Sequence, residues 1–236
     1  MNFDVCTFDD AVADLLATAT AEAAVGGTRL SNAWCVVIAE KNKDYAALLN
    51  SPGRTLPDGA PVAALIRRRD TTSTAERVRG PSFFEAALDR SQATEIRHFF
   101  IGATPETLAS LLKQVGQRYP QAHISGSWAP PFGPVDDALL NEAIRRVRAS
   151  GANLVWVGMG SPKQDFVANA IARETGVPAV GVGAAFDFAA GTVAQAPVWV
   201  QRYGLEWLFR LAREPRRLGR RYLLGNLQFL LIVAYR

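Results

Sequence analysis

The sequence has 236 residues, of which 49% are hydrophobic and 20% are charged, which is enough apolar material for one large domain or two small lobes. Its two cysteines, Cys6 and Cys35, exclude a disulfide framework, and no Cys/His spacing is typical of a zinc site. The N-terminal stretch MNFDVCTFDD is acidic where a signal peptide is basic, and no uninterrupted apolar run reaches the roughly 18 residues needed to span a bilayer. We therefore expect a cytoplasmic protein that does not cross a membrane.

The positive charge of the chain is concentrated at its C-terminal end. Residues 202–236 contain eight Arg and two Glu, a balance of +6, so the formal net charge of +4 leaves −2 for residues 1–201. Such asymmetry indicates a polyanionic partner, either nucleic acid or an anionic membrane surface. We divide the chain accordingly into a core, residues 1–201, and a basic C-terminal appendage, residues 202–236.

The N-terminal third contains helical patterns separated by a loop. Residues 4–24 have apolar positions at helical spacing, and Thr7, with acidic residues in the turn after it, predicts a capped start to a surface helix. Residues 34–50 are apolar and then amphipathic. The stretch SPGRTLPDGAP, residues 51–61, is dense in Pro and Gly and predicts a loop, with the next helix beginning near Val62.

From residue 97 onward, apolar runs alternate with amphipathic helices. The runs RHFFIGAT, HISGSW, NLVWVGMG and VPAVGVG predict four strands, and a helix pattern follows each of the first three. The last run lacks polar alternation, which suits a strand covered on both faces. This order predicts an α/β fold: a Rossmann-like parallel sheet core with flanking helices, followed by a basic amphipathic helical appendage.

In such sheets, ligands bind beyond the carboxyl ends of the strands. Gly158 and Gly160 in the loop GMGSPKQ would let backbone N–H groups approach a phosphate, and Gln164 offers an amide donor and acceptor to a polar ligand. A tight turn packed on the sheet would have the same glycines. The loop matches neither G-x-G-x-x-G nor the P-loop pattern, which disfavours a dinucleotide oxidoreductase or a P-loop NTPase.

Other polar residues allow both a functional and a structural interpretation. Asp187, between two phenylalanines in FDF, could accept hydrogen bonds from a ribose or sugar hydroxyl, or could cap a turn. Asp58 in LPDG is typical of a β-turn or a helix N-cap, and Asn32 of a capping residue. His98 and His123 lie in or at the start of predicted strands, where structural roles are more common.

The tail LEWLFRLAREPRRLGRRYLLGNLQFLLIVAYR interleaves arginines with large apolar residues. A basic amphipathic helix with aromatic residues suits an anionic bilayer interface. Nucleic acid is the rival partner, but no recognised DNA- or RNA-binding motif accompanies the patch, so we expect none. Alternatively, the arginines pair with acids on the body of the protein.

Several motifs that are ambiguous alone occur together in one order. They are SN-A-WCVVIAEKNKDYAALLN, LPDG, RGPSFFEAAL, the G-x-PKQ segment, VGVGAAFDFAAG, QAPVW and LEWLFRLAREPRRLGRRY. In this series the sequence closely resembles the bacterial WecG/TagA/CpsF glycosyltransferases, which build surface polysaccharides and wall teichoic acid linkage units. The matching segments span about residues 30–228. The resemblance implies an inverting, metal-independent enzyme without a cofactor, which moves a sugar from a UDP-sugar to an undecaprenyl-diphosphate-linked sugar.

The resemblance also implies roles for residues. Asp58 matches the aspartate proposed as general base, Asn32 and Gln164 match positions attributed to substrate positioning, and Asp187 with the glycines before it, including Gly183, matches the nucleotide side. The tail arginines that match contacts to the lipid-linked diphosphate are Arg210, Arg217 and Arg220. The enzyme would be peripheral on the cytoplasmic face of the plasma membrane. N-acetylmannosamine, its uronic acid and glucose are all compatible as donor sugars, and homo-oligomerisation is compatible with the sequence.

Three positions depart from the family pattern. Leu30 stands where Thr is common, Asp165 replaces a common Glu after PKQ, and Gln195 replaces a common Arg. The loss of a hydroxyl at position 30 keeps a second hypothesis open, in which the protein is a catalytically inactive UDP-sugar-binding assembly protein at the membrane. A third hypothesis, a cytosolic nucleotide-dependent oxidoreductase, is weakened by the absent dinucleotide fingerprint.

Overall fold

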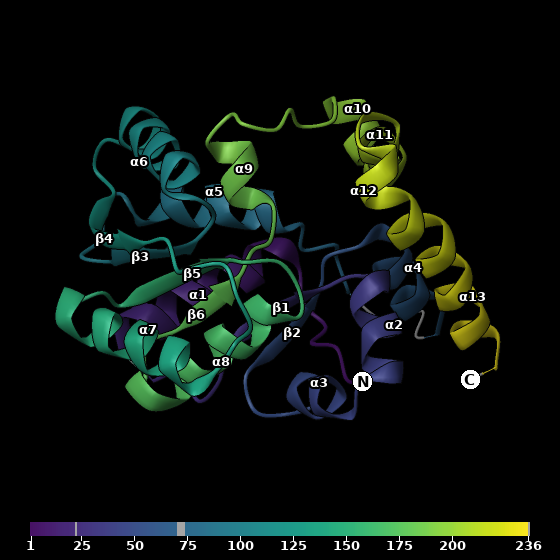
Figure 1. The fold of residues 1–236 in the computed structure, drawn as a ribbon, viewed down its shortest axis with the longest axis horizontal. Helices are drawn as coiled ribbons and strands as arrows, with labels where there is room; N and C mark the ends of the chain where they lie inside the picture. The colour runs from purple at the N-terminus through teal and green to yellow at the C-terminus, as the bar shows by residue number, and fades with distance from the viewer. Residues whose placement is uncertain (22, 70–73, 236) are drawn as a thin grey trace.

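A computed structural model describes residues 1–21, 23–69 and 74–235 of the chain, and the side chains of Arg217, Arg220 and Arg221 lie outside this description. Six parallel strands form one sheet in the order β2-β1-β6-β5-β3-β4 (Figure 1). The strands are β1 (Thr28–Ser31), β2 (Arg54–Pro57), β3 (Arg97–Gly102), β4 (His123–Trp128), β5 (Leu154–Gly158) and β6 (Ala179–Gly181). The predicted Rossmann-like α/β core is confirmed.

Helices cover both faces of this sheet. One cluster of buried residues joins helices α1, α5, α6 and α9 to one face, and a second joins α7 and α8 to the other. Their bounds are α1 (Phe8–Ala21), α5 (Gly80–Ser91), α6 (Pro105–Arg118), α7 (Asp137–Ser150), α8 (Lys163–Thr175) and α9 (Ala185–Ala189). The sequence of β5 is an unbroken apolar run because both faces of the strand are buried. Trp156 faces the first cluster, whereas Val155 and Val157 face the second.

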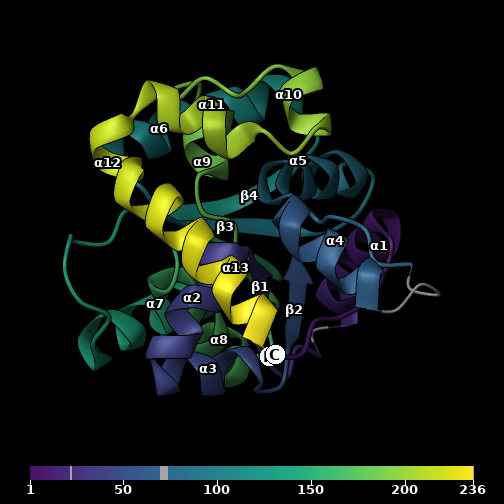
Figure 2. The same ribbon diagram turned by 90° about the vertical axis from the view of Figure 1, so that its right-hand side faces the viewer.

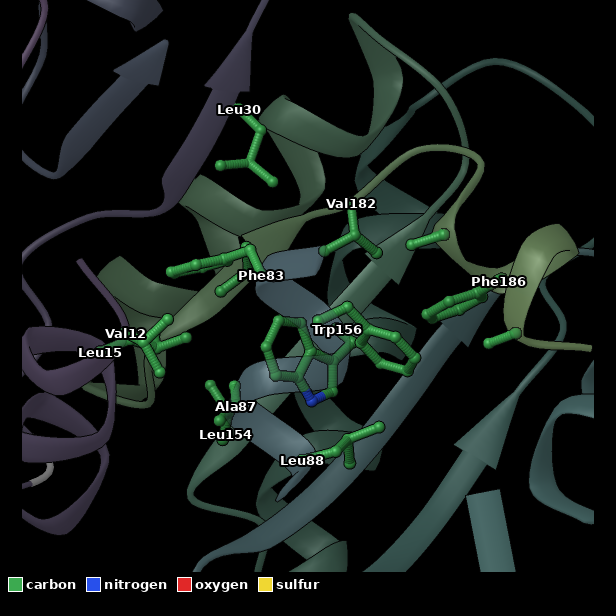
Figure 3. Packing of buried hydrophobic residues seen from close by; sticks show 14 of the residues in the cluster. Val12, Leu15, Leu30, Phe83, Ala87, Leu88, Leu154, Trp156, Val182 and Phe186 are labelled. Carbon is green, nitrogen blue, oxygen red and sulfur yellow. The ribbon is translucent and has the colours of Figure 1, made fainter. Parts of the chain in front are cut away.

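Trp156 lies at the centre of the first cluster and organises it (Figure 3). Its ring packs edge-on against Phe84, with ring centroids 5.0 Å apart. Its indole N–H donates to Nδ1 of His98 over 3.0 Å, which leaves the other ring nitrogen to donate to Ser91 over 2.9 Å. Burial lowers the pKa of His98 to about 4, so the ring stays neutral at neutral pH. The structural role expected for His98 is therefore confirmed.

The N-terminal third contains elements that the sequence patterns do not reveal. Helix α1 begins after Thr7, whose hydroxyl caps the helix as expected by accepting from the Asp10 N–H. Strands β1 and β2 were not predicted, and β2 lies inside the predicted loop of residues 51–61. Each has four residues, and β1 carries Arg29, which is 1% exposed and bonds Thr55 and Ser51. A buried arginine and short strands leave no apolar run to detect.

Three further helices follow β1 and β2. Helices α2 (Ala33–Lys41) and α3 (Lys43–Leu49) come after β1, and α4 (Ala60–Arg69) comes after β2. The side chain of Asn32 caps α2 by accepting from the N–H groups of Trp34 and Cys35, at 3.0 and 3.4 Å. This capping role is one of those that the sequence left open for Asn32.

The C-terminal segment wraps around one side of the core. It consists of α10 (Val198–Arg202), α11 (Glu206–Arg213), α12 (Pro215–Gly219), a π-helical turn η1 (Arg220–Leu224) and α13 (Gly225–Tyr235). Helix α13 lies along α2 (Figures 1 and 2), where Phe229 packs with Ala33, Val37 and Val62. None of the helices in the described part of the chain is both long and apolar enough to span a membrane.

Candidate active site

A cavity of about 830 Å³ opens at the carboxyl edge of the sheet, where the loops after the strands meet the C-terminal segment. Residues that follow each of the six strands line the cavity, together with residues of α11, η1 and α13. The sequence-predicted site residues that line it are Asn32, Asp58, Gly158, Gly160, Gln164, Gly183, Asp187 and Arg210. The fold therefore brings together, in one cavity, residues spread over about 180 positions of the chain.

Asp58 directly follows β2, and every polar group it carries has a partner. Its carboxylate accepts from the backbone N–H of Gly80 over 3.0 Å and from the side-chain amide of Asn32 over 3.4 Å. Its own N–H donates to the Ser31 carbonyl over 3.1 Å, and its carbonyl accepts from Arg77 over 2.8 Å. Asp58 is thus held in one orientation rather than forming only a local turn. Among the described residues, these two donors occupy two of the roughly four lone-pair sites of the carboxylate.

Gln164 joins the two glycine-rich loops. Its side-chain oxygen accepts from the N–H of Gly160 over 3.0 Å and from the N–H of Gly183 over 2.8 Å, and the residue is 2% exposed. The Gly160 N–H donates to Gln164 in this structure, and the approach of backbone N–H groups of these loops to a phosphate stays a prediction. Gly160 and Gly183 have φ of +75° and +58°, values that favour glycine, so part of their role is to allow these turns.

Gly158 and Leu30 line the cavity but also serve the core beneath it. A Cβ on Gly158 would lie 2.5 Å from the Phe186 ring, so glycine is needed there for packing. Leu30 is 4% exposed and belongs to the same buried cluster as Val182 and Phe83 (Figure 3). The side chain that replaces a threonine of the family pattern therefore fills the core.

Several basic side chains line the cavity, and among those that the structure describes the sequence analysis singled out only Arg210. The guanidinium carbon of Arg210 lies over the Phe188 ring, 5.6 Å from the ring centroid. The buried Nε atom of Arg210 has no hydrogen-bond partner among the described residues. Lys163, Arg77 and Arg79 also line the cavity and were missed, although the R-x-R spacing was a signal. Arg217 and Arg220, the other predicted contacts, have side chains outside the described part of the structure.

Glu206 is a further lining residue that the sequence did not single out. Its carboxylate lies between Arg79, at 2.7 Å, and Arg77. Arg79 also donates to the Gln195 side chain over 3.2 Å. A guanidinium is therefore present beside position 195, although the residue there is neutral where the family commonly has Arg. The lone acid in LEWLF, within an arginine-rich tail, was the available signal for Glu206.

Phe132 marks the end of the cavity farthest from Asp58 along the sheet. It follows β4, one edge strand, whereas Asp58 follows β2, the other edge strand. The Phe132 side chain is fully exposed, and the Lys163 ammonium lies 5.0 Å from its ring centroid. Lys163 also donates to the Gly133 carbonyl, so it ties this loop to the start of α8. An exposed aromatic ring is thereby held at the rim.

Asp165 lies behind the cavity, not in it. It is 1% exposed, and the Tyr45 hydroxyl donates to its carboxylate over 2.6 Å. Desolvation raises the pKa of Asp165 to about 6, against smaller opposing effects that include hydrogen bonds from Tyr45 and Ser161 and the charge of Arg29. Asp165 lies in the first turn of α8, next to Gln164, on the buried side of the loop that joins β5 to α8.

No group of three or more His, Cys, Asp or Glu side chains in the described residues could hold a metal ion. Fold and site together define an α/β protein whose ligand cavity lies over the carboxyl edge of a parallel sheet, as in many nucleotide-binding proteins. The family model of the WecG/TagA/CpsF glycosyltransferases matches residues 1–236, and the chain belongs to this family. The protein is therefore a glycosyltransferase of polysaccharide biosynthesis, a class that in general uses a nucleotide-sugar donor and a lipid-linked acceptor.

We expect the titration of Asp165 to make the folded protein less stable as pH rises from about 4 to about 7. The raised pKa means that the folded state keeps a proton that the unfolded chain releases near pH 4. The shift of about two units corresponds to roughly 3 kcal/mol. Asp165→Asn should therefore gain about 2 to 3 kcal/mol relative to the wild type between pH 4 and pH 7, measured by urea unfolding.

Tyr45→Phe provides the matched comparison. It removes the hydrogen bond that lowers the pKa of Asp165, so the loss of stability with rising pH should become larger and extend to higher pH. If the stability difference between Asp165→Asn and the wild type stays constant from pH 4 to pH 7, the pKa of Asp165 is not raised in the folded protein.

Proposed function

We propose that this protein is an inverting, metal-independent glycosyltransferase that moves a sugar from a UDP-sugar to an undecaprenyl-diphosphate-linked sugar. The observation that carries the proposal is the fixed carboxylate of Asp58, held by Asn32 and the Gly80 N–H at one end of the large cavity. A carboxylate that is oriented by donors and still has lone pairs facing a cavity is suited to general base catalysis.

The shape of the cavity supports one direction for the donor. The exposed Phe132 ring offers a stacking surface for uracil at the β4 end, since bases stack on aromatic side chains without needing specific hydrogen bonds. Lys163 and the N-terminal end of α8 lie next along the sheet edge and suit the diphosphate. The sugar then extends toward Asp58, and Asp187 lines the same cavity with a carboxylate that can accept from hydroxyl groups.

The reaction is a single displacement. Asp58 takes the proton of the acceptor hydroxyl while the hydroxyl oxygen forms a bond to the anomeric carbon. The bond from that carbon to the UDP oxygen breaks, and UDP leaves with the electron pair. Attack opposite to the leaving group inverts the anomeric configuration. Cations, helix N-termini and backbone N–H groups stabilise the charge that develops on UDP without a metal ion.

The acceptor diphosphate is the proposed ligand of the tail arginines. Arg210 lines the cavity and has a buried Nε atom with no hydrogen-bond partner in the described structure, as expected for a donor whose ligand is an anion. In this proposal Arg217 and Arg220 also bind the diphosphate, because the charge and forked geometry of guanidinium suit phosphate.

Asp58→Asn should lower kcat by about two to four orders of magnitude, because the amide cannot accept the proton, while UDP binding stays close to normal. The measurement is UDP release from a panel of UDP-sugars with a prenyl-diphosphate-linked acceptor, with and without EDTA. The donor affinity is measured in parallel by calorimetry. Turnover by the wild type should be insensitive to EDTA.

Phe132→Ala is the contrasting variant. It removes a proposed stacking surface worth roughly 1 to 3 kcal/mol, so it should raise the KM for the donor with little change in kcat.

Undiminished turnover by Asp58→Asn would remove Asp58 from the mechanism. UDP binding by the wild type without transfer to any acceptor would favour the alternative, an inactive assembly protein.

We also propose that the C-terminal segment docks on an anionic membrane surface. Helix α13 and the turn before it expose a row of large apolar side chains, and the arginines of α11 and α12 lie directly upstream. The exposed apolar residues are Leu223, Leu224, Leu227, Leu230, Leu231 and Tyr235. Apolar side chains beside basic ones are typical of a segment that lies in the membrane interface.

Changing Arg217 and Arg220 together to Glu should weaken binding to anionic liposomes by at least roughly tenfold, because each basic residue near such a surface contributes about 1 kcal/mol. The measurement is co-sedimentation with vesicles of defined phosphatidylglycerol content. The control variant changes Lys113 and Arg173, two exposed basic residues of α6 and α8, to Glu. Equal binding by both variants would contradict docking through the tail.

A further inference from the structure

Glu206 connects the C-terminal segment to the loop that holds Asp58. It lies in the first turn of α11, and its two carboxylate oxygens bind Arg79, at 2.7 Å, and Arg77. The side chains of these three residues are 14%, 9% and 25% exposed, respectively, so solvent screens the ion pairs only in part. One carboxylate therefore balances two guanidinium groups that come from the segment before α5.

That short segment, residues 77–80, also fixes Asp58. Arg77 donates through Nε to the Asp58 carbonyl over 2.8 Å, and Gly80 donates through its N–H to the Asp58 carboxylate over 3.0 Å. Val78 donates to the Pro57 carbonyl over 2.8 Å. A second group of Arg77 donates to the Gln201 carbonyl of α10 over 3.2 Å. The same few residues thus contact both the tail and Asp58.

We propose that Glu206 is a positioning residue for Asp58, so that docking of the tail on the core sets the orientation of the base. Two neighbouring guanidinium groups repel each other, and Glu206 removes this repulsion by binding both. Without it, Arg77 and Arg79 become partly buried cations with no carboxylate between them, and the nearby carboxylate of Asp58 becomes their alternative partner. An arginine bound to that carboxylate would occupy lone pairs needed for the acceptor proton. This inference rests on the proposed role of Asp58.

Glu206→Gln keeps the size of the side chain and one carbonyl oxygen but removes the charge. It should lower kcat by about tenfold to a hundredfold, an effect typical of a misplaced catalytic group, with the donor KM changed by less than about threefold. In the pH profile of kcat, the acidic limb should move to lower pH. Hydrogen exchange of the Gly80 backbone amide should become faster. The control is Glu174→Gln, which changes an exposed carboxylate in the last turn of α8 and should alter none of these readouts.

Two double variants test whether the effect of Glu206→Gln acts through Arg79 and Asp58. Arg79→Gln combined with Glu206→Gln removes one cation together with the anion, and should recover kcat relative to Glu206→Gln alone. In the Asp58→Asn background, Glu206→Gln should cause no additional loss of the residual rate, because the base it positions is already absent. Additive losses would overturn the inference.

The outcomes separate this inference from the proposed function. Absence of transfer by the wild type to any acceptor would end the proposed function itself. Full turnover by Asp58→Asn would remove Asp58 from the mechanism, and the positioning role of Glu206 with it. Loss of turnover by Asp58→Asn, with unchanged kcat and unchanged Gly80 exchange in Glu206→Gln, would overturn only the role of Glu206. Lower activity of Glu206→Gln with a raised donor KM and unchanged Gly80 exchange would assign Glu206 to substrate binding, which also overturns the inference.

Discussion

The carboxylate of Asp58 and the donors that orient it are the interaction on which the rest of the site depends. Three segments far apart in the sequence meet there: the loop after β2, the N-cap of α2 and the start of α5. Asn32 uses its oxygen to cap α2 and its amide to bind Asp58, so one side chain links helix geometry to the candidate base. A carboxylate at the end of a strand becomes a positioned base because the parallel sheet aligns the ends of β1 and β2.

The opposite part of the cavity is organised by a different principle. Gln164 holds two glycine loops together through one buried oxygen, and Asp165 supports the same turn of α8 from the core. The cavity is therefore shaped before any ligand binds, which lowers the ordering cost of binding. The burial that raises the pKa of Asp165 makes this support costly in stability at neutral pH. Such a cost is common where a site must be rigid.

Much of the fold could be predicted from the sequence, because β3, β5 and β6 are apolar runs and amphipathic helices separate the strands from β3 to β6. Strands β1 and β2 could not, since they are short and Arg29 is buried by contacts that arise only in the folded chain. The same distinction holds for the site. Asp58 and Gln164 lie in motifs that a family resemblance identifies, whereas the clamp made by Gln164 and the ion pairs of Glu206 depend on residues up to 129 positions apart. No local pattern encodes such pairings.

The most direct measurement for a single displacement with Asp58 as base is the anomeric configuration of the transferred sugar. Proton NMR of the purified product, made from a UDP-α-sugar and a synthetic prenyl-diphosphate-linked acceptor, gives this from the coupling constant and chemical shift of the anomeric proton, assigned against reference compounds. Direct attack by the acceptor hydroxyl predicts a β-linked product. An α-linked product would require a second inversion or a front-side attack, and would contradict the mechanism built on Asp58.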